Sequence, residues 1–446
     1  MLINHNQNML CLDEFDILEL RENADECDYL FVVSPKIETK ICTKCGSCNV
    51  VNYGRYTKLV RDININEHYT ALKIRGHKHL CKDCGSIFVD RFNTLDLCSK
   101  MTNRLRCKIQ QLSLTKPFKH IAREYKLSVT TIEKIALAYI REKDSQHIMY
   151  SPEVLGIDEA HLNGSIRCVL TDINEHLLFE MLPKRDKQTV MNYLDSLPDS
   201  NNIKVVTMDM YRPYREAVYE CLPDAAIVID RFHVVKLIND VLSDYRKTLC
   251  KQLSAAEKKE INSVQKVLNA NRKDLTANQN KKLGYIYSKY PELKMAYDLK
   301  EEFREIYECT NRRAAVLKYT KWSRKVKQNF SPYISITETV NRWSLEIFNY
   351  FDHPYTNGVT EAINGCIKAI ARDGKGYSFE ILRGKVLYGQ AYKTKAIFSY
   401  NKFSPTVHYV TGHSTRSSLN MIQNLMNSYK QISGADIDRL KLGLFK

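Results

Sequence analysis

The chain has 446 residues, and at roughly 100–200 residues per domain this length predicts two to four domains. An apolar share of 44% suffices for hydrophobic cores and excludes wholesale disorder. The sequence contains no run of about 18 consecutive apolar residues, so we expect neither a membrane-spanning helix nor a membrane partner. A formal net charge of +16 favours a polyanionic partner, with nucleic acid as the leading candidate.

The N-terminus and the cysteine usage indicate a reducing compartment. The first residues, MLINHNQNMLCLDEF, lack the basic segment and apolar run of a secretory signal, so we expect a cytoplasmic protein. The 14 cysteines are too few for a disulfide scaffold of this length. They are expected to be buried thiols, catalytic thiols or metal ligands, and their spacing decides between these roles.

Residues 1–40 form an N-terminal segment in which an acidic stretch precedes a predicted strand at 29–33. Residues 41–93 follow, with two CxxC motifs that are each succeeded by glycine. Four thiolates in two such knuckles suit tetrahedral zinc, so we predict a zinc ribbon with one structural Zn²⁺ and no open coordination position. The predicted ligands are Cys42, Cys45, Cys81 and Cys84.

Other interpretations of this cysteine motif remain open. Cys45 and Cys48 also form a CxxC motif, and His77 or His79 could replace a cysteine ligand. We prefer Cys42 with Cys45 because both pairs then have the form CxxCG. The four thiols could also be unmetallated core residues.

Residues 94–150 carry the strongest charge asymmetry of the chain, with eight Lys or Arg and a single acid, Glu124, between positions 100 and 126. The apolar spacing predicts a short helix at 118–125, a turn, and a second helix from 129 with Ser128 as its N-cap. This order is typical of a DNA-binding helix-turn-helix. An ordinary packed helical hairpin is the alternative. The residues expected to contact DNA are Thr130, Thr131 and Lys134 on the second helix, with Lys119 and Arg123 on the first.

From residue 151 onward, short apolar runs alternate with helical patterns in the order β-β-β-α-β-α-β-α. We therefore predict an α/β domain that begins at 151–245, is interrupted by an all-helical basic insertion at 246–345, and resumes at 346–400. Residues 401–446 predict a helical tail to which we assign no role. The predicted strands lie at 154–157, 167–171, 176–180, 203–208 and 225–229.

Three carboxylates are the candidate chemical site. Asp158 and Asp209 each follow a buried strand, where an uncompensated charge is unfavourable, and Glu361 lies in the first turn of a helix that follows Asn357 and Gly358. If they converge, they form a site for two hard divalent cations, Mg²⁺ or Mn²⁺, which can activate a water or a 3′-hydroxyl at a phosphodiester.

Other carboxylates compete for this role. Glu159 would point to the opposite face of its strand, and Asp172 lies in a turn, where Asp is common for local hydrogen bonding. Asp230 follows a strand and is a stronger rival, but it also suits the N-cap of the next helix. Any one of these carboxylates alone is more often a cap or a solvated turn residue, so the hypothesis depends on the three together.

With these segments, the chain resembles the DDE transposases of bacterial insertion sequences, and most closely the ISL3 family. The resemblance covers roughly residues 40–395. The most specific matches are Asp230-Arg-Phe-His-Val-Val-Lys236 and Thr356-Asn-Gly-Val-Thr-Glu-Ala-Ile-Asn364; others are Cys81–Phe88, Leu155–Glu159 and Val206–Met210. Relatives often have Ser where this chain has Thr356, a conservative difference.

The resemblance implies an N-terminal zinc ribbon and helix-turn-helix, then a ribonuclease-H-like domain with a mixed five-stranded sheet and a helical insertion. It implies that Asp158, Asp209 and Glu361 are the catalytic triad, and that His233 supports this site or contacts the scissile strand. A partly buried helix histidine is the other interpretation of His233. The implied activity is cleavage and strand transfer of DNA at terminal inverted repeats by a homodimer.

Two alternatives to this function are carried forward. One is a non-catalytic DNA-binding regulator that uses only the ribbon and the helix-turn-helix. The other is a metal-dependent nuclease of the same fold that does not transfer strands.

Overall fold

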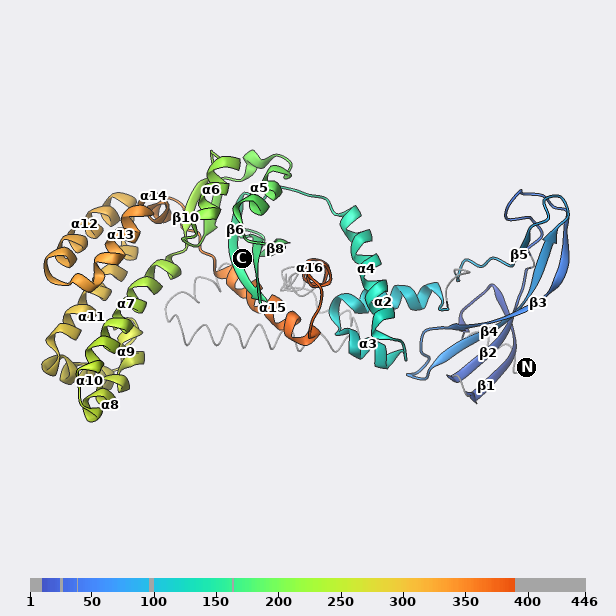
Figure 1. The fold of residues 1–446 in the computed structure, drawn as a ribbon, viewed down its shortest axis with the longest axis horizontal. Helices are drawn as coiled ribbons and strands as arrows, with labels where there is room; N and C mark the ends of the chain where they lie inside the picture. Colours follow the sequence, from blue (N-terminus) through green and yellow to red (C-terminus); the bar gives the residue numbers. More distant parts are fainter. Residues whose placement is uncertain (1–9, 25–26, 38, 96–99, 163, 390–446) are drawn as a thin grey trace, which may run out of the picture. The chain divides into compact units, whose positions relative to one another are not determined.

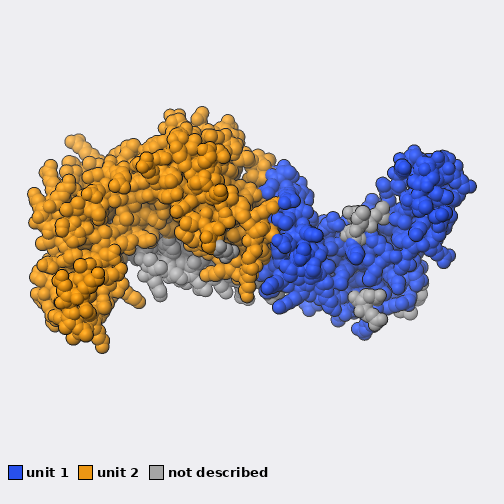
Figure 2. Space-filling model, in the orientation of Figure 1, with its two compact units in different colours: residues 1–146 blue, residues 147–446 orange. Residues whose placement is uncertain are grey.

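The computed structural model describes residues 10–24, 27–37, 39–95, 100–162 and 164–389. The chain divides into two compact units, residues 1–146 and 147–446, which are coloured separately in Figure 2. The predicted helical tail, 401–446, lies outside the described residues. Within the described ranges, no helix is long and apolar enough to cross a membrane.

The first unit contains a five-stranded sheet with the order β1-β2-β4-β3, and β5 pairs with β4. Strand β2 runs parallel to β4, whereas the other neighbours are antiparallel. The N-terminal segment 1–40 and the cysteine-rich segment 41–93 therefore share one sheet, and Phe31, Val33 and Leu72 are buried in its core. The strands are β1 (Phe15–Ala24), β2 (Cys27–Pro35), β3 (Val50–Arg61), β4 (Thr70–Cys81) and β5 (Ile87–Val89).

Three helices follow in the same unit: α2 (Asn103–Thr115), α3 (Phe118–Glu124) and α4 (Val129–Gln146). The Ser128 hydroxyl accepts a hydrogen bond of 3.1 Å from the Thr131 amide, so Ser128 caps α4 as its residue type predicts. Helix α4 buries Ile132, Ala136 and Ile140, which recur every four residues on one face. Its opposite face is left to solvent.

Side chains from the sheet hold the end of α3. The Arg61 guanidinium donates to the carbonyls of Tyr125 and Lys126 at 3.0 and 2.8 Å, and the Tyr69 hydroxyl donates to the Arg123 carbonyl at 2.7 Å. Helix-end carbonyls lack the full set of intrahelical partners, so the contacts both cap α3 and fix the helical pair against the sheet.

The second unit is built on a mixed five-stranded sheet with the order β10-β9-β6-β7-β8 (Figure 1). Strands β6, β7 and β8 form an antiparallel meander, and β9 and β10 add in parallel to β6. The strands are β6 (Val154–Leu162), β7 (Ser165–Asp172), β8 (Leu177–Leu182), β9 (Val205–Met208) and β10 (Ala226–Ile229).

Helices cover both faces of this sheet. Helices α5 (Lys187–Asp195) and α6 (Arg212–Cys221) pack against Leu155 and Ile157 of β6. On the other face, α15 (Gly358–Gly374) packs Ile363 and Ile367 against Ala160, and α16 (Phe379–Tyr388) extends this layer. Even-numbered residues of β6 thus face α15, because side chains alternate along a strand.

A helical segment joins these layers and contains no strand among its described residues. It comprises α7 (Arg231–Lys251), α8 (Ala255–Ser263), α9 (Gln265–Asn269), α10 (Ala277–Lys289), α11 (Pro291–Arg304), α12 (Arg312–Asn329), α13 (Ile334–Arg342) and α14 (Ser344–Phe348). Short 3₁₀ turns interrupt or end this segment at η2 (Arg272–Asp274), η3 (Glu305–Glu308), η4 (Ser331–Tyr333) and η5 (Asn349–Phe351). A further 3₁₀ turn, η1 (Ser200–Asn202), precedes β9.

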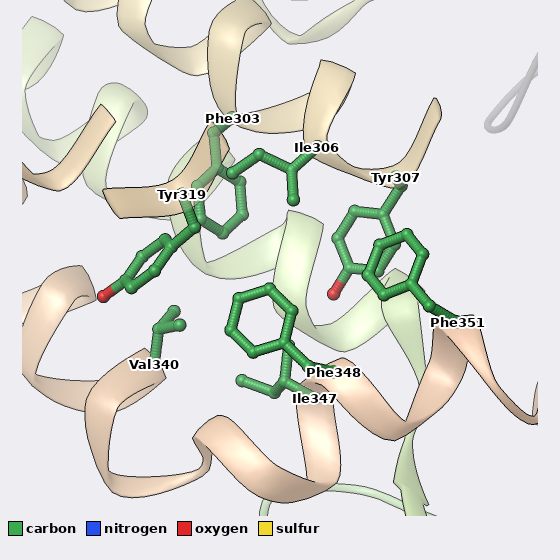
Figure 3. A pocket seen from close by; sticks show the side chains of 8 residues that line it. All are labelled: Phe303, Ile306, Tyr307, Tyr319, Val340, Ile347, Phe348 and Phe351. Atoms are coloured by element: carbon green, nitrogen blue, oxygen red, sulfur yellow. The ribbon is translucent and has the colours of Figure 1, made fainter. Parts of the chain in front are cut away.

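Aromatic and aliphatic side chains fill the interior of the helical segment, and Figure 3 shows eight of them, five aromatic and three aliphatic, around one small gap. They enclose a gap of about 10 Å³, which admits at most one water. Trp322 and Trp343 are both buried, and the Trp322 indole donates to the Leu299 carbonyl at 2.8 Å. Both rings therefore pack in the core of the second unit.

Strand β6 of the second unit's sheet is longer than the predicted strand at 154–157. Strand β6 continues to Leu162 because β7 pairs with it along its whole length. Asp158 therefore lies within a strand rather than at its end. The parallel pairing of β6 with β9, however, stops at Ile157 and Met208, immediately before Asp158 and Asp209.

Candidate active site

Strand register brings three aspartates to one edge of the parallel part of the sheet. Ile157 of β6 pairs with Met208 of β9, and Met208 pairs with Ile229 of β10. The residue after each of these three is an aspartate, so Asp158, Asp209 and Asp230 follow the same rung of adjacent parallel strands. The sequence predicts the first two here and leaves Asp230 as a rival that also suits an N-cap.

Helix α15 is fixed against this edge by buried polar contacts. The Asn357 side chain donates to the Ile157 carbonyl at 3.1 Å and accepts from the Thr207 hydroxyl at 2.5 Å. Thr360 and Thr171 hydroxyls lie 2.7 Å apart. A Cβ at Gly156 would come within 2.7 Å of the Thr360 hydroxyl, so only glycine allows this close approach. Glu361, in the first turn of α15, is thereby held near the aspartates.

One turn further along α15, Asn364 contacts the first aspartate. Its amide donates to the Asp158 carboxylate at 2.8 Å, and its own carbonyl oxygen is buried with no hydrogen-bond partner among the described residues. Asn364 therefore orients Asp158 from the same helix that carries Glu361. Asn364 is the last residue of the motif Thr356–Asn364, and the sequence alone predicts no role for it.

His233 lies between the carboxylates. It is in the first turn of α7, where Asp230 caps the helix by accepting from the Phe232 amide at 3.3 Å. The Nδ1 atom of His233 is 3.0 Å from Asp209 Oδ2, and its Nε2 atom is 3.7 Å from Glu361 Oε1. Asp230, His233 and Glu361 also offer ligand atoms that all lie within 4.8 Å of one another.

The electrostatics of the cluster reflect buried like charges. Burial raises the pKa of Asp158, and burial together with Asp158 and Asp230 raises the pKa of Asp209 to about 7. Burial, reinforced by Glu361, raises the pKa of Asp230 to about 6. Burial acts to lower the pKa of His233, but the surrounding carboxylates outweigh it and raise that pKa.

The residues present suit divalent cations. Four carboxylates converge in a small buried region, and Asp209 Oδ1 is buried with no hydrogen-bond partner among the described residues. Carboxylate oxygens are the ligands that Mg²⁺ prefers, and a bound cation would satisfy the orphaned oxygen and relieve the mutual repulsion.

Two of the three rival carboxylates, Glu159 and Asp172, have other partners. Glu159 points away from the cluster to Arg185, whose Nη1 atom lies 2.6 Å from it, and the Arg185 guanidinium stacks 4.7 Å over Tyr211. Asp172 accepts from the Glu175 amide at 2.9 Å and from the Tyr150 hydroxyl at 3.0 Å. Both are therefore local structural residues, as their positions suggest.

A second cluster lies in the first unit. The Sγ atoms of Cys42, Cys45, Cys81 and Cys84 all lie within 4.8 Å of one another, with 3.6 Å between Cys42 and Cys84 and between Cys45 and Cys81. Tetrahedral zinc with bonds of about 2.3 Å requires sulfurs separated by about 3.8 Å. This set could therefore hold zinc, whereas Cys48 lies outside it and His79 is bonded to Asp90 at 2.8 Å.

Both cysteine knuckles have the same local geometry. Gly46 and Gly85 adopt positive φ values of 75° and 69°, and their amides donate to the carbonyls of Cys42 and Cys81 at 3.0 and 2.9 Å. These tight turns require glycine. The Ser86 hydroxyl lowers the pKa of the Cys42 thiol to about 5 and also lowers that of Cys84, whereas the neighbouring cysteines raise the pKa of the Cys45 thiol.

Comparison with known proteins decides the family. The ISL3 model of the DDE transposases, described as "Transposase", matches residues 155–386, just over half of the chain and the whole carboxylate cluster. The chain belongs to the ISL3 transposase family.

Individual transposases that match longer stretches of this chain agree with this assignment. The ISL3 chain is 26% identical over 359 residues to the transposase for insertion sequence element IS1001 of Bordetella parapertussis, covering 77% of this chain and 87% of that protein. It is 23% identical over 252 residues to transposases for IS1557 from two strains of Mycobacterium tuberculosis, covering 50% of this chain and 56% of those proteins.

In this ISL3 chain, the residues expected to contact nucleic acid lie on exposed parts of α3 and α4. Thr130 and Lys134 are exposed on α4, and Lys119 and Arg123 are exposed on α3. Thr131 is half-buried, and its hydroxyl lies 2.8 Å from that of Ser128. Thr131 therefore contributes to the helix cap, and the other four are available to a partner.

Proposed function

We propose that the chain catalyses metal-dependent cleavage and transfer of DNA strands at the ends of an insertion sequence, with Asp158, Asp209 and Glu361 as its catalytic triad. The shared register of Ile157, Met208 and Ile229 is the observation that carries this proposal, because it aligns carboxylates from separate strands at one sheet edge. Membership of a transposase family supports the same conclusion.

We infer a ribonuclease-H-like catalytic fold from the strand order. Three antiparallel strands followed by two parallel ones, with the first strand central, match the arrangement that the family resemblance implies. The catalytic aspartates then come from the central strand and its parallel neighbour. The glutamate comes from α15, which packs across the same sheet.

The protein residues mainly orient reacting groups. Mg²⁺ or Mn²⁺ held by the triad would polarise the phosphodiester and lower the pKa of a bound water or 3′-hydroxyl. Asn364 positions Asp158, Asn357 positions the helix that carries Glu361, and His233 bridges Asp209 and Glu361. Burial of these carboxylates excludes bulk water and strengthens each electrostatic contact.

The first unit is proposed to bind the terminal inverted repeats. Zinc would fix the two cysteine knuckles, and α4 would enter a DNA groove with Thr130 and Lys134 toward the bases. Thr131 is assigned to the start of the same helix, and Lys119 and Arg123 of α3 to phosphate contacts. Two element ends must be paired before transfer, so the active form is proposed to be a homodimer.

The helical insertion offers a second DNA-binding surface on α12. This helix has seven Lys or Arg and no acid. Lys318 forms an ion pair of 2.9 Å with Glu305 of η3, and Lys325 forms one of 2.9 Å with Glu302 of α11. Along the outer stripe, Arg313, Arg324 and Lys327 are exposed and have no ion pair with any described residue. Uncompensated like charges along a helix are unfavourable, and a DNA backbone would offset that cost.

Strand-transfer assays on the full chain test the proposed function. A labelled element end and a target plasmid should yield joined products in the presence of Mg²⁺. Asp209→Asn should abolish cleavage and joining while DNA binding persists, whereas Asp224→Asn, an exposed control, should retain both. Cleavage without joining would indicate the nuclease instead. Retained biological activity in Asp209→Asn would indicate the non-catalytic regulator.

A further inference from the structure

The imidazole of His233 has the surroundings of a metal ligand rather than of a simple bridging group. Asp209 Oδ2 lies 3.0 Å from Nδ1 of the ring. The opposite nitrogen, Nε2, faces Glu361, whose Oε1 atom is 3.7 Å away. Metal-bound histidines typically have a carboxylate beside their other ring nitrogen, and Asp209 occupies that place here.

The other two ligands of such a site are already in position. Asp230 is buried, with only 2% of its surface exposed, and is held by the Phe232 amide at the start of α7. Glu361 is held by the docking of α15 on the sheet. Ligand atoms of Asp230, His233 and Glu361 lie within 4.8 Å of one another, a separation that one cation can span.

We propose that one of the two catalytic cations is bound by Asp230, His233 Nε2 and Glu361, with Asp209 as the residue that orients the imidazole. This inference rests on the proposed function and deepens it, since it adds two ligands to the triad. Asp209 then contributes its two oxygens separately. Oδ2 holds the histidine, and the buried, unpartnered Oδ1 is left to the other cation beside Asp158.

An imidazole ligand changes which metals the site prefers. Imidazole nitrogen suits first-row transition ions, whereas Mg²⁺ prefers an all-oxygen ligand set. The site formed by Asp230, His233 and Glu361 should therefore bind Mn²⁺ more tightly than Mg²⁺, and this selectivity should depend on His233.

Electron paramagnetic resonance with Mn²⁺ as the probe tests the assignment directly on the full, zinc-loaded chain. Titration should give two bound Mn²⁺ per chain, and pulsed spectra should contain a ¹⁴N coupling from a directly bound imidazole. His233→Gln should remove the coupling and weaken one of the two sites by at least about 100-fold, more than loss of an outer partner costs. Asp230→Asn keeps the helix cap and should weaken the same site while the coupling persists at saturating Mn²⁺.

The matched control is His161→Gln, which alters an exposed histidine of β6 in the same unit. It should leave the stoichiometry, affinity and nitrogen coupling unchanged. Two bound Mn²⁺ without nitrogen coupling, together with unchanged affinity in His233→Gln, would overturn this inference and leave the proposed function intact. Absence of any bound Mn²⁺ together with loss of strand transfer in the unmodified chain would overturn both.

Discussion

Replacing Asp209 by asparagine should stabilise the second unit while it abolishes catalysis. The carboxyl has a pKa of about 7 in the folded protein against an ordinary value of 3.8, mainly because it is buried. Ionising it in the folded state therefore lowers the free energy of unfolding. An asparagine at this position carries no charge and has nearly the same shape as the aspartate.

The magnitude and its pH dependence follow from the two pKa values. The folded protein keeps this proton to higher pH than the unfolded chain does, so stability falls as pH rises from about 4 to about 7. Each pH unit in that window costs about 1.4 kcal/mol, which gives at most about 4 kcal/mol above it. Between pH 5 and pH 8, the stability gained by Asp209→Asn should grow by about 2–3 kcal/mol. His233, whose pKa is also raised, acts in the same direction.

Urea denaturation followed by tryptophan fluorescence measures this quantity in the intact chain. Both tryptophans, Trp322 and Trp343, are buried in the second unit, so the signal reports that unit alone. Chelators are avoided because they would also remove zinc, and the buffers contain no added divalent cation. Asp224→Asn serves as the exposed control and should follow the original chain at every pH.

Added Mg²⁺ provides an internal check. At pH 8 it should stabilise the original chain more than Asp209→Asn, because only the original chain has the full set of charges that the cation neutralises. Stability curves for the two proteins that run parallel from pH 5 to pH 8 would refute the reasoning.

Three further predictions concern other parts of the chain. Cys84→Ser should abolish binding of one equivalent of zinc, measured by a colorimetric metal assay, and should leave the tryptophan-detected unfolding of the second unit unchanged. Asn357→Ala removes two buried hydrogen bonds of α15 and should cost about 3 kcal/mol in the same urea assay, with loss of cleavage; unaltered stability would contradict the anchoring role. Changing Arg313, Arg324 and Lys327 together to Gln should reduce the slope of log affinity for DNA against log salt by about three, whereas the equally exposed set Lys259, Lys281 and Lys282 should leave it unchanged if α12 is the contact.

Short-range spacing was sufficient for several features of this ISL3 chain. The CxxCG motifs predicted the four cysteines that the structure brings together, because each knuckle is a local turn whose glycine frees the necessary backbone conformation. The cap at Ser128 and the strand and helix order of the second unit follow equally from local periodicity. Such features depend on residues that are close in sequence, so the sequence by itself determined them.

The composition of the carboxylate site depended on the tertiary structure. Asp158 and Asn364 are separated by 206 positions, yet they share a hydrogen bond. Asp230 has the local pattern of a helix cap and does cap α7, but strand register also brings it beside His233 and Glu361. The register between the parallel strands and the position of α15 depend on contacts between residues far apart in the sequence. Burial of apolar side chains on both faces of the sheet stabilises these contacts. Periodicity within one segment contains no information on which rung of a distant strand it will meet.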